Sequence, residues 1–292
     1  YPEHTGHDRL SSEYNSIKVI KAHDACSSVP SPLGCDLELS AAMYEWIDGN
    51  VVDCPTNKHV QQALDFLEQL HGFRCLPVFE NFKNASAAFL SGASFEDQLK
   101  ARLHSLLLFS PKYPEMHDYL QREMLPGIEE ITGWARSAWR INPGYDEALP
   151  RSQQTLSPSD FGFHNTIERK NGELVFIDFE YFGWDDPVKL IVDFSLHPGM
   201  ALNSALKQQW FEGTVKIYGE SILERLRLAW PMVGLCWCLI LLNEYRGDVW
   251  MRRCGANAEK SRHREAILAA QLRLSRSLLG MIRERYRQFP FH

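Results

Sequence analysis

The chain has 292 residues, of which 45% are hydrophobic and 23% are charged. This composition is typical of a globular protein, large enough for one big domain or two lobes, and it excludes wholesale disorder. The formal net charge of -6 argues against a general attraction to nucleic acid or to anionic membranes. The longest apolar run, Leu228–Leu242, contains Pro231 and Gly234 and is too short to span a bilayer, so a buried helix is expected there.

The cysteines bear on the cellular compartment. They are Cys26, Cys35, Cys54, Cys75, Cys236, Cys238 and Cys254. Their number is odd, they form no Cys-x-x-Cys pair, and most of them lie in apolar surroundings. This usage predicts buried thiols in a reducing cytoplasm, rather than a disulfide framework or a zinc site.

The first part of the chain shows clear periodic patterns. Apolar spacing predicts a helix over Arg9–His23. The stretch Leu37–Ile47 alternates and is rich in apolar residues, which predicts one strand that ends at Asp48-Gly49. A helix capped by its first residue is expected over Thr56–His71, and residues 94–140 are expected to be mostly helical.

The sequence pattern changes between Ser152 and Pro198, where short apolar runs alternate with turn-forming residues. Asn171-Gly172 stands between two such runs, which predicts a β-hairpin. After Pro198 the chain is expected to be helical again, and its last helix is expected over about residues 259–288.

The stretch that is most informative about chemistry runs from Ser157 to Tyr181. Asp160 lies five residues before Asn165, a hairpin follows, and Asp178 comes directly after an apolar strand. Transfer of a phosphoryl group from a nucleotide needs a carboxylate that orients and deprotonates the acceptor hydroxyl, and oxygen ligands that hold magnesium against the phosphates. A loop that exposes Asp160 and Asn165, and a strand that ends at Asp178, can supply this set.

These residues resemble the aminoglycoside phosphotransferase and choline kinase family, a branch of the protein-kinase-like fold. The family's catalytic loop runs His-Gly-Asp, four residues, Asn, and its metal aspartate follows an apolar strand and is often followed by Phe-Glu. The sequence matches at Asp160, at Asn165 and at Asp178-Phe-Glu180, and Pro158 stands where the family usually has histidine. The resemblance implies that Asp160 is the catalytic base and that Asn165 and Asp178 hold Mg²⁺.

The resemblance extends upstream to the nucleotide site. Tyr44–Gly49 is similar to the family's hinge, which implies that backbone groups near Glu45, Trp46 and Ile47 bind the base of ATP or GTP. Glu13 stands where the glutamate of the family's first helix would fall. Neither a glycine-rich phosphate loop nor a strand lysine precedes that helix, so the resemblance implies that this sequence lacks the first half of the small lobe.

The acceptor site is less defined. Asp185 and Asp186 lie in a segment that resembles the family's stretch after the metal aspartate, and they can contact an acceptor, cap a helix or face water. Trp230 can line a substrate pocket, although an aromatic stripe at helical spacing is more often core. His164 and His197 are expected to be packed or hydrogen-bonded.

The patterns and the resemblance together predict an α+β, protein-kinase-like fold. A partial N-terminal lobe is expected over 1–47, and a mainly helical C-terminal lobe over 48–292, with the catalytic loop and metal motif at 157–187. The implied activity is Mg²⁺-dependent transfer of phosphate from ATP or GTP to a hydroxyl of a sugar, an amino alcohol or an aminoglycoside-like molecule. Nucleic acid and membrane are not expected as partners.

Two alternatives are a catalytically inactive domain that binds nucleotide and a protein-interaction domain on the same scaffold. Retention of Asp160, Asn165 and Asp178 favours the enzyme, because a binding module needs no magnesium ligands.

Overall fold

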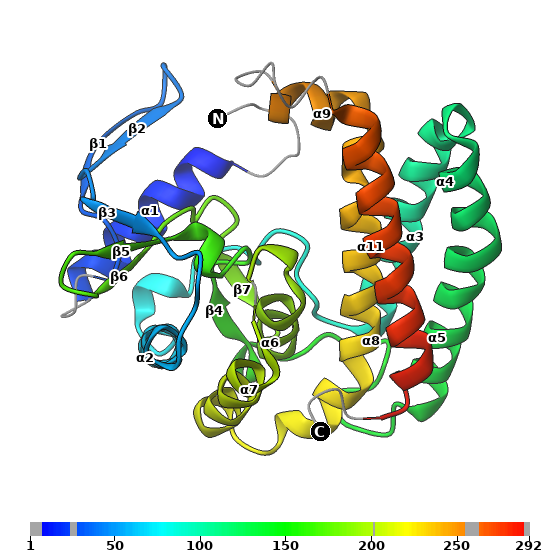
Figure 1. Cartoon of the computed structure of the whole chain (residues 1–292). Helices are drawn as coiled ribbons and strands as arrows, with labels where there is room; N and C mark the ends of the chain where they lie inside the picture. Colours follow the sequence, from blue (N-terminus) through cyan, green and yellow to red (C-terminus); the bar gives the residue numbers. More distant parts are fainter. Residues whose placement is uncertain (1–7, 24–27, 201, 255–262, 289–292) are drawn as a thin grey trace. The chain divides into compact units, whose positions relative to one another are not determined.

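The computed structural model of the chain describes residues 8–23, 28–200, 202–254 and 263–288 (Figure 1). The chain divides into two compact units. Unit 1 combines the chain up to Phe89 with Leu149–Leu223, and unit 2 combines Leu90–Ala148 with the chain from Glu224 onward. Helices dominate and the strands form small sheets, which confirms the predicted α+β class.

Unit 1 holds the strands and the helices around them. Its elements are α1 (Arg9–His23), β1 (Pro32–Asp36), β2 (Ala41–Tyr44), β3 (Gly49–Val51), α2 (Asn57–Phe73), β4 (Thr155–Ser157), β5 (Thr166–Arg169), β6 (Leu174–Phe176), β7 (Gly183–Asp185), α6 (Pro187–Leu196) and α7 (Ser204–Tyr218). The strands pair antiparallel as β1-β2, β3-β5-β6 and β4-β7. Helix α2 packs against α7, β4 and β6 (Figure 1).

The two helices predicted in this part of the chain are confirmed. Helix α1 has the predicted bounds and buries Leu10, Ile17 and Ile20. Helix α2 begins after Thr56, whose side chain accepts the backbone N–H of His59. This bond satisfies one of the amide groups that a helix leaves free at its N-terminus.

The single strand predicted over Leu37–Ile47 is wrong. The chain instead forms the hairpin β1-β2, which reverses at residues 37–40. The Asp36 carboxylate makes this turn by accepting the backbone N–H groups of Glu38 and Leu39, each at 2.9 Å. Leu37 and Leu39 are 70% and 76% exposed, so they belong to the turn and not to a buried face of a strand. The alternating apolar pattern therefore gave the wrong prediction here.

The hairpin predicted at Asn171-Gly172 is confirmed as β5-β6. Gly172 adopts a positive φ of 80°, which glycine reaches without steric cost. On the other edge of β5, β3 pairs through Gly49 opposite Arg169. A Cβ atom on Gly49 would lie 2.3 Å from the carbonyl oxygen of Glu168, so only glycine fits this close approach of two backbones.

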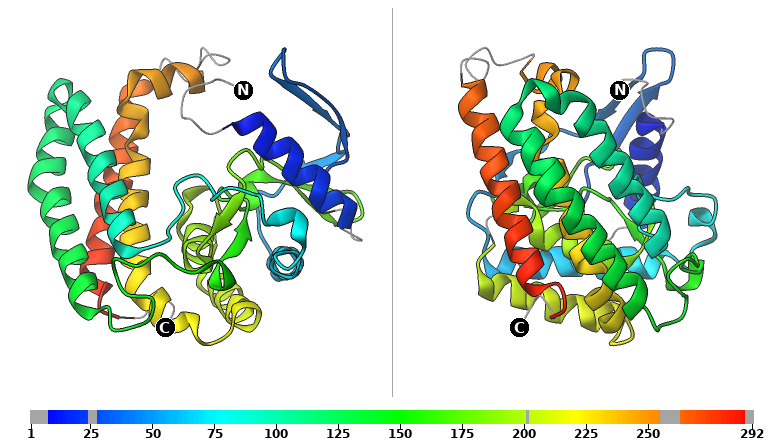
Figure 2. Two further views of the ribbon diagram at one scale, coloured as in Figure 1. Left: turned by 180° about the vertical axis from the view of Figure 1, so that it is seen from behind. Right: turned by 90° about the vertical axis from the view of Figure 1, so that its right-hand side faces the viewer.

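Unit 2 is helical. Its helices are α3 (Gly92–Phe109), α4 (Pro114–Tyr119), α5 (Leu125–Ala138), α8 (Ile222–Leu241, which starts in unit 1), α9 (Gly247–Cys254) and α11 (Arg264–Arg285). A π-helical turn, Leu120–Met124, joins α4 to α5. The long helices of this unit lie side by side in both views of Figure 2. The predicted helical stretch 94–140 is thus confirmed. The last helix, predicted over about 259–288, is confirmed over Arg264–Arg285, and residues 259–262 lie outside the described part of the chain.

One stretch, Ile222–Tyr245, is long and apolar enough to cross a membrane by length and composition, with a mean hydropathy of 1.6. However, 78% of its most apolar window is buried inside the protein. The buried helix expected over Leu228–Leu242 is therefore observed, as part of α8.

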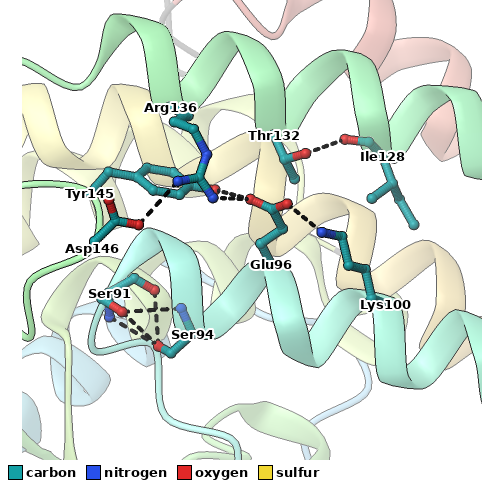
Figure 3. A network of polar contacts seen from close by, with 9 residues as sticks. All are labelled: Ser91, Ser94, Glu96, Lys100, Ile128, Thr132, Arg136, Tyr145 and Asp146. Carbon is teal, nitrogen blue, oxygen red and sulfur yellow. Dashed lines mark hydrogen bonds and ion pairs between the residues drawn. The ribbon is translucent and has the colours of Figure 1, made fainter.

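A polar network ties α3 to α5 in unit 2 (Figure 3). The buried carboxylate of Glu96 accepts from Lys100 Nζ at 2.6 Å, from Arg136 Nη2 at 3.0 Å and from the Tyr145 hydroxyl at 2.8 Å. Arg136 also reaches Asp146 at 3.1 Å. Burial opposes the ionised form of Glu96, but the bonds from Lys100, Tyr145 and Arg136 outweigh it, and the pKa of Glu96 is lowered.

The expectation of buried cysteines is confirmed for two of the five whose side chains are described. Cys236 and Cys238 are buried in α8, but Cys35, Cys54 and Cys75 are exposed. The side chains of Cys26 and Cys254 lie outside the described residues. Short apolar runs around the exposed cysteines belong to edges and turns of unit 1, which local composition does not distinguish from core.

Candidate active site

A sharply bent loop carries Asp160 out of β4. Ser159 has a positive φ of 68°, and its hydroxyl donates to the carbonyl oxygen of Ser86 at 3.2 Å. The Asp160 N–H then donates to the Pro158 carbonyl oxygen at 2.9 Å. Pro158, at the position where histidine was expected, thus supplies a backbone acceptor within the turn. A short 3₁₀ turn, Phe163–Asn165, closes the loop.

The Asp160 side chain is hydrogen-bonded on one side and open on the other. Its Oδ1 lies 3.0 Å from His164 Nε2, while the side chain as a whole is 41% exposed. Burial opposes ionisation, but the bond from His164 and the nearby His197 and Lys189 outweigh it, so the pKa of Asp160 is lowered. Asp160 is therefore a carboxylate at neutral pH, the form that can accept a proton.

Two hydrogen bonds to backbone carbonyl groups bring the loop and the second aspartate together. The side-chain amide of Asn165 donates from Nδ2 to the Asp160 carbonyl oxygen at 3.0 Å. The Ile177 N–H donates to the Asn165 carbonyl oxygen, also at 3.0 Å. Since Asp178 follows Ile177 directly, these bonds place Asp160, Asn165 and Asp178 in one region of unit 1.

Asp178 has a strained backbone conformation and is surrounded by negative charge at the end of the hairpin. It adopts a positive φ of 65°, which is rare for a residue with a side chain. Burial, followed by the charges of Glu180, Glu13 and Asp160, raises the pKa of Asp178 to about 6. Like charges gathered around a part-buried carboxylate are the setting in which a divalent cation is most favourable.

The donor set suits magnesium. Asp178 offers a carboxylate and Asn165 an amide oxygen, and hard oxygen ligands are those that Mg²⁺ prefers. The crowded negative charge around Asp178 is the observation that favours a cation here. The residues predicted as metal ligands are thus chemically fit to hold Mg²⁺.

Helix α1 is fastened to the segment that follows Asp178. Arg9 forms an ion pair with Glu180 at 3.3 Å, and its guanidinium lies 5.0 Å from the ring centre of Tyr181. The Ser12 hydroxyl donates to the Phe182 carbonyl oxygen at 3.1 Å. Glu13, on the same helix, is buried and acts electrostatically on Asp178.

Comparison with solved structures identifies this architecture. An aminoglycoside phosphotransferase from Alicyclobacillus acidocaldarius is 14% identical, with a TM-score of 0.56 over 94% of this chain and 82% of that one. A spectinomycin phosphotransferase in complex with ADP and spectinomycin is 12% identical, with a TM-score of 0.57 over 94% and 83%. A choline kinase from Streptococcus pneumoniae is 13% identical, with a TM-score of 0.53 over 93% and 80%.

The chain has the fold of these protein-kinase-like phosphotransferases. The predicted fold is therefore confirmed. No family model matches the sequence, and no curated protein matches it. At these identities the likeness concerns the fold, so the roles of individual residues depend on the geometry of the site.

The segment predicted to be the hinge is anchored by Glu45. Its carboxylate accepts from the N–H and hydroxyl of Ser31 and from Arg169 Nη2 at 2.9 Å. The Ser31 hydroxyl, then Arg169, lower the pKa of Glu45 to about 2. The Glu45 N–H already donates to the Ser31 carbonyl oxygen at 2.8 Å, so the side chain and N–H of this residue serve the fold.

The next two hinge residues differ sharply in exposure. Trp46 is 87% exposed, and its indole N–H donates to Asp48 at 3.2 Å. Ile47 is buried. The residues predicted to receive the nucleotide base therefore differ in their surroundings.

The two acidic residues considered for acceptor binding are fully buried. Asp185 accepts the backbone N–H groups of Phe89 and Asp186 at 2.8 and 2.7 Å, and it lies 3.5 Å from Lys189 Nζ. Asp186 caps α6 by accepting the Val188 N–H at 2.9 Å. Of the three alternatives, helix capping describes Asp186, and both carboxylates are engaged in the fold.

Trp230 lies in the core of unit 2. It is only 1% exposed, and its indole N–H donates to the Gln288 carbonyl oxygen at 3.1 Å. This placement favours the core alternative over a substrate pocket.

Sequence reasoning missed the partnership of two histidines at Asp160. His164 and His197 stack with ring centroids 3.7 Å apart, although they stand far apart in the chain. No local spacing pattern links a histidine in a loop to one that follows a helix. The His-Pro pair at 197–198, which ends α6, was the only signal available.

Proposed function

We propose that the chain is a small-molecule phosphotransferase that uses ATP or GTP. The observation that carries this proposal is the convergence of Asp160, Asn165 and Asp178 through the bonds of Asn165 and Ile177 within a kinase-like fold. A base and two magnesium ligands in one place are the parts that phosphoryl transfer requires.

Asp160 acts as the base. The hydroxyl oxygen of the acceptor forms a bond to the γ-phosphorus, the bond from that phosphorus to the β–γ bridging oxygen breaks, and ADP or GDP leaves. The hydroxyl proton passes to Asp160 and from there to solvent. A carboxylate with a lowered pKa that is 41% exposed is ready to accept this proton and able to release it.

Asn165 and Asp178 hold the magnesium ion. When bound, Mg²⁺ neutralises charge on the transferring phosphoryl group. The negative surroundings of Asp178 support this assignment, because they disfavour an isolated carboxylate there.

The hinge at Glu45, Trp46 and Ile47 receives the nucleotide base, through the backbone of the last two residues. The spectinomycin phosphotransferase with the same fold is described in complex with ADP, which supports a nucleotide co-substrate. Glu13 completes the site from α1, next to Asp178.

The acceptor is a hydroxyl compound such as a sugar, an amino alcohol or an aminoglycoside. This range follows the substrates named for proteins of the same fold, which include spectinomycin and choline. A lobe boundary near residue 47, a cytoplasmic location and the absence of nucleic-acid and membrane partners stay predictions.

Turnover against a panel of acceptors tests the proposal. The chain is incubated with Mg²⁺ and γ-labelled ATP or GTP, together with an aminoglycoside, choline, ethanolamine or a hexose. Label transfer to one class of acceptor, lost in Asp160→Asn, would support it. Magnesium-dependent nucleotide binding without transfer to any acceptor would favour the inactive nucleotide-binding domain, and no nucleotide binding would favour an interaction domain.

A further inference from the structure

Two histidines brace Asp160 in unit 1. His164 Nε2 lies 3.0 Å from Asp160 Oδ1, and the His164 ring stacks on His197 with planes only 11° from parallel. His164 belongs to the 3₁₀ turn after Asp160, whereas His197 follows the last residue of α6. The proposed function gives neither histidine a role.

The surroundings of His164 determine where its proton lies. Its Nδ1 is buried and has no hydrogen-bond partner within the described part of the chain. A proton on Nδ1 would be a buried donor without an acceptor, at a cost of about 1–3 kcal/mol. A proton on Nε2 has the Asp160 carboxylate as its acceptor, so Nε2 is assigned as the ring nitrogen that donates to Asp160.

His197 is held by the chain around it. Its backbone N–H donates to the Asp193 carbonyl oxygen at 2.9 Å, and its Nδ1 accepts the Gly199 N–H at 3.1 Å. Burial, and then the neighbouring His164, lower the pKa of His197 to about 4. The ring is therefore neutral at physiological pH and can lie flat on His164 without charge repulsion.

The turn after His197 packs directly on the catalytic loop. Met200 Sδ accepts the Phe163 N–H at 3.0 Å. A Cβ atom on Gly162 would lie 2.5 Å from Met200 Sδ and 2.8 Å from the His164 ring. Gly162 thus lets both the turn and the ring approach the loop, and the two histidines are fixed relative to Asp160.

A zinc site is the competing interpretation of this cluster. The ligand atoms of Asp160, His164 and His197 lie within 4.8 Å of one another, and zinc accepts such a set. The stack disfavours it, because a metal ion binds imidazole nitrogen close to the ring plane at about 2.0–2.1 Å. Two nearly parallel rings with centroids 3.7 Å apart do not both point to one ion.

We propose that His164, held by the stacked His197, is a positioning residue that fixes Asp160 through Oδ1 and leaves Oδ2 to take the acceptor proton. Within the described residues, the hydrogen bond from His164 is the only one to the Asp160 carboxylate. The acceptor step rests on the proposed function, whereas the hydrogen bond and the stack do not.

Paired amide substitutions test the role of Nε2. His164→Gln places an amide N–H where Nε2 lies, whereas the shorter His164→Asn places it near Nδ1. Turnover of MgATP with water as acceptor should stay within about threefold for Gln and should fall roughly 10–100-fold for Asn, the cost of a misplaced catalytic group. The KM for MgATP should not change, because His164 is assigned to the acceptor side.

His197 gives an independent comparison. His197→Phe keeps a stacked ring and should retain kcat, whereas His197→Ala should lower it. His104→Asn, at an exposed position of α3, serves as the control. Equal losses for His164→Gln and His164→Asn, or a change confined to KM, would overturn the proposal. If His164→Asn does not fold by circular dichroism, the His197 pair decides.

We call the hydrogen bond from His164 to Asp160, together with the stack on His197, the brace. Nitrogen-15 NMR of the imidazole rings in the nucleotide-free protein tests the brace without any turnover. We expect the proton of the neutral His164 ring to lie on Nε2, with Nδ1 bare. A proton on Nδ1, or zinc bound one per chain and lost in both His164→Asn and His197→Ala, contradicts the brace even if MgATP is turned over. Absence of magnesium-dependent nucleotide binding in the wild type, with the proton on Nε2, would refute the proposed function and support the brace.

Discussion

The backbone N–H of Ile177 donates to the carbonyl oxygen of Asn165 at 3.0 Å. This one bond joins the loop that carries Asp160 to the strand end that carries Asp178. It explains how a short hairpin between the two segments brings Asp160, Asn165 and Asp178 together.

Removal of the charge of Asp160 should stop the chemistry and spare the fold. Asp160→Asn should lower kcat by roughly 10²–10⁴-fold, the usual contribution of a general base. Turnover of MgATP with the acceptor found in the panel, or with water, measures it. Asp53→Asn, at an exposed position of unit 1, is the matched control and should leave kcat unchanged. An unchanged kcat in Asp160→Asn would remove this residue from the mechanism.

The raised pKa of Asp178 predicts that its ionised carboxylate lowers the stability of the metal-free protein, and that this loss depends on pH. Its pKa rises from 3.8 to about 6 on folding, so the native state binds the proton more tightly than the unfolded state. The stabilisation that proton binding at Asp178 gives to the native state is fully present below about pH 4 and is lost as the pH rises through about 6. After a discount for partial exposure it amounts to roughly 1–2 kcal/mol.

Asp178→Asn should therefore stabilise the metal-free protein at pH 7.5 but not at pH 4.5. Urea unfolding at the two pH values, with EDTA present, measures this difference. Asp53→Asn again serves as the control and should show no such pH dependence. If Asp178→Asn were less stable than wild type at both pH values, the electrostatic cost assigned to Asp178 would be incorrect.

Glu96 should matter for the stability of unit 2 and not for the active site. Glu96→Ala leaves the buried Tyr145 hydroxyl without its acceptor and should lower the free energy of unfolding by about 1–3 kcal/mol. Asp97→Asn, the exposed neighbour, should change it little. Because the pKa of Glu96 is lowered, its contribution is present above about pH 4.5 and is lost as the pH falls below that value. Equal stability of Glu96→Ala and wild type at pH 7 would contradict this role.

Gly49 should tolerate no side chain. Gly49→Ala would place Cβ 2.3 Å from the Glu168 carbonyl oxygen and should cost about 1–3 kcal/mol through strain in β3 and β5. Gly72→Ala, in α2, meets nothing within 4 Å and should be neutral or stabilising. Urea midpoints of the two variants give the comparison. Equal midpoints would mean that β3 and β5 approach less closely than described.

The parts of the site that sequence could predict are those encoded locally. Asp160, Asn165 and Asp178 stand in one short stretch, and the Asn-Gly turn between them fixes how that stretch folds back. The family resemblance that these residues carry therefore led to the prediction of a kinase-like fold.

The parts that sequence could not predict depend on distant contacts or on burial. The stack of His164 on His197 needs α6 and the turn at Pro198 to return to the loop, and no spacing rule records that. Asp186 is the buried N-cap of α6, although an aspartate at this place in the sequence is equally compatible with a substrate contact. The hairpin β1-β2 was not predicted because Leu37 and Leu39 continue an alternating apolar pattern through an exposed turn.

Magnesium-dependent nucleotide binding tests the central claim most directly, because it needs no acceptor. Isothermal titration of ATP and GTP into the chain is carried out with Mg²⁺ and with EDTA, for wild type, Asp178→Ala and the control Asp53→Ala. The account predicts binding that Mg²⁺ strengthens in wild type and in Asp53→Ala, and loss of this magnesium effect in Asp178→Ala. An equal magnesium effect in Asp178→Ala and wild type would contradict the assignment of the metal site.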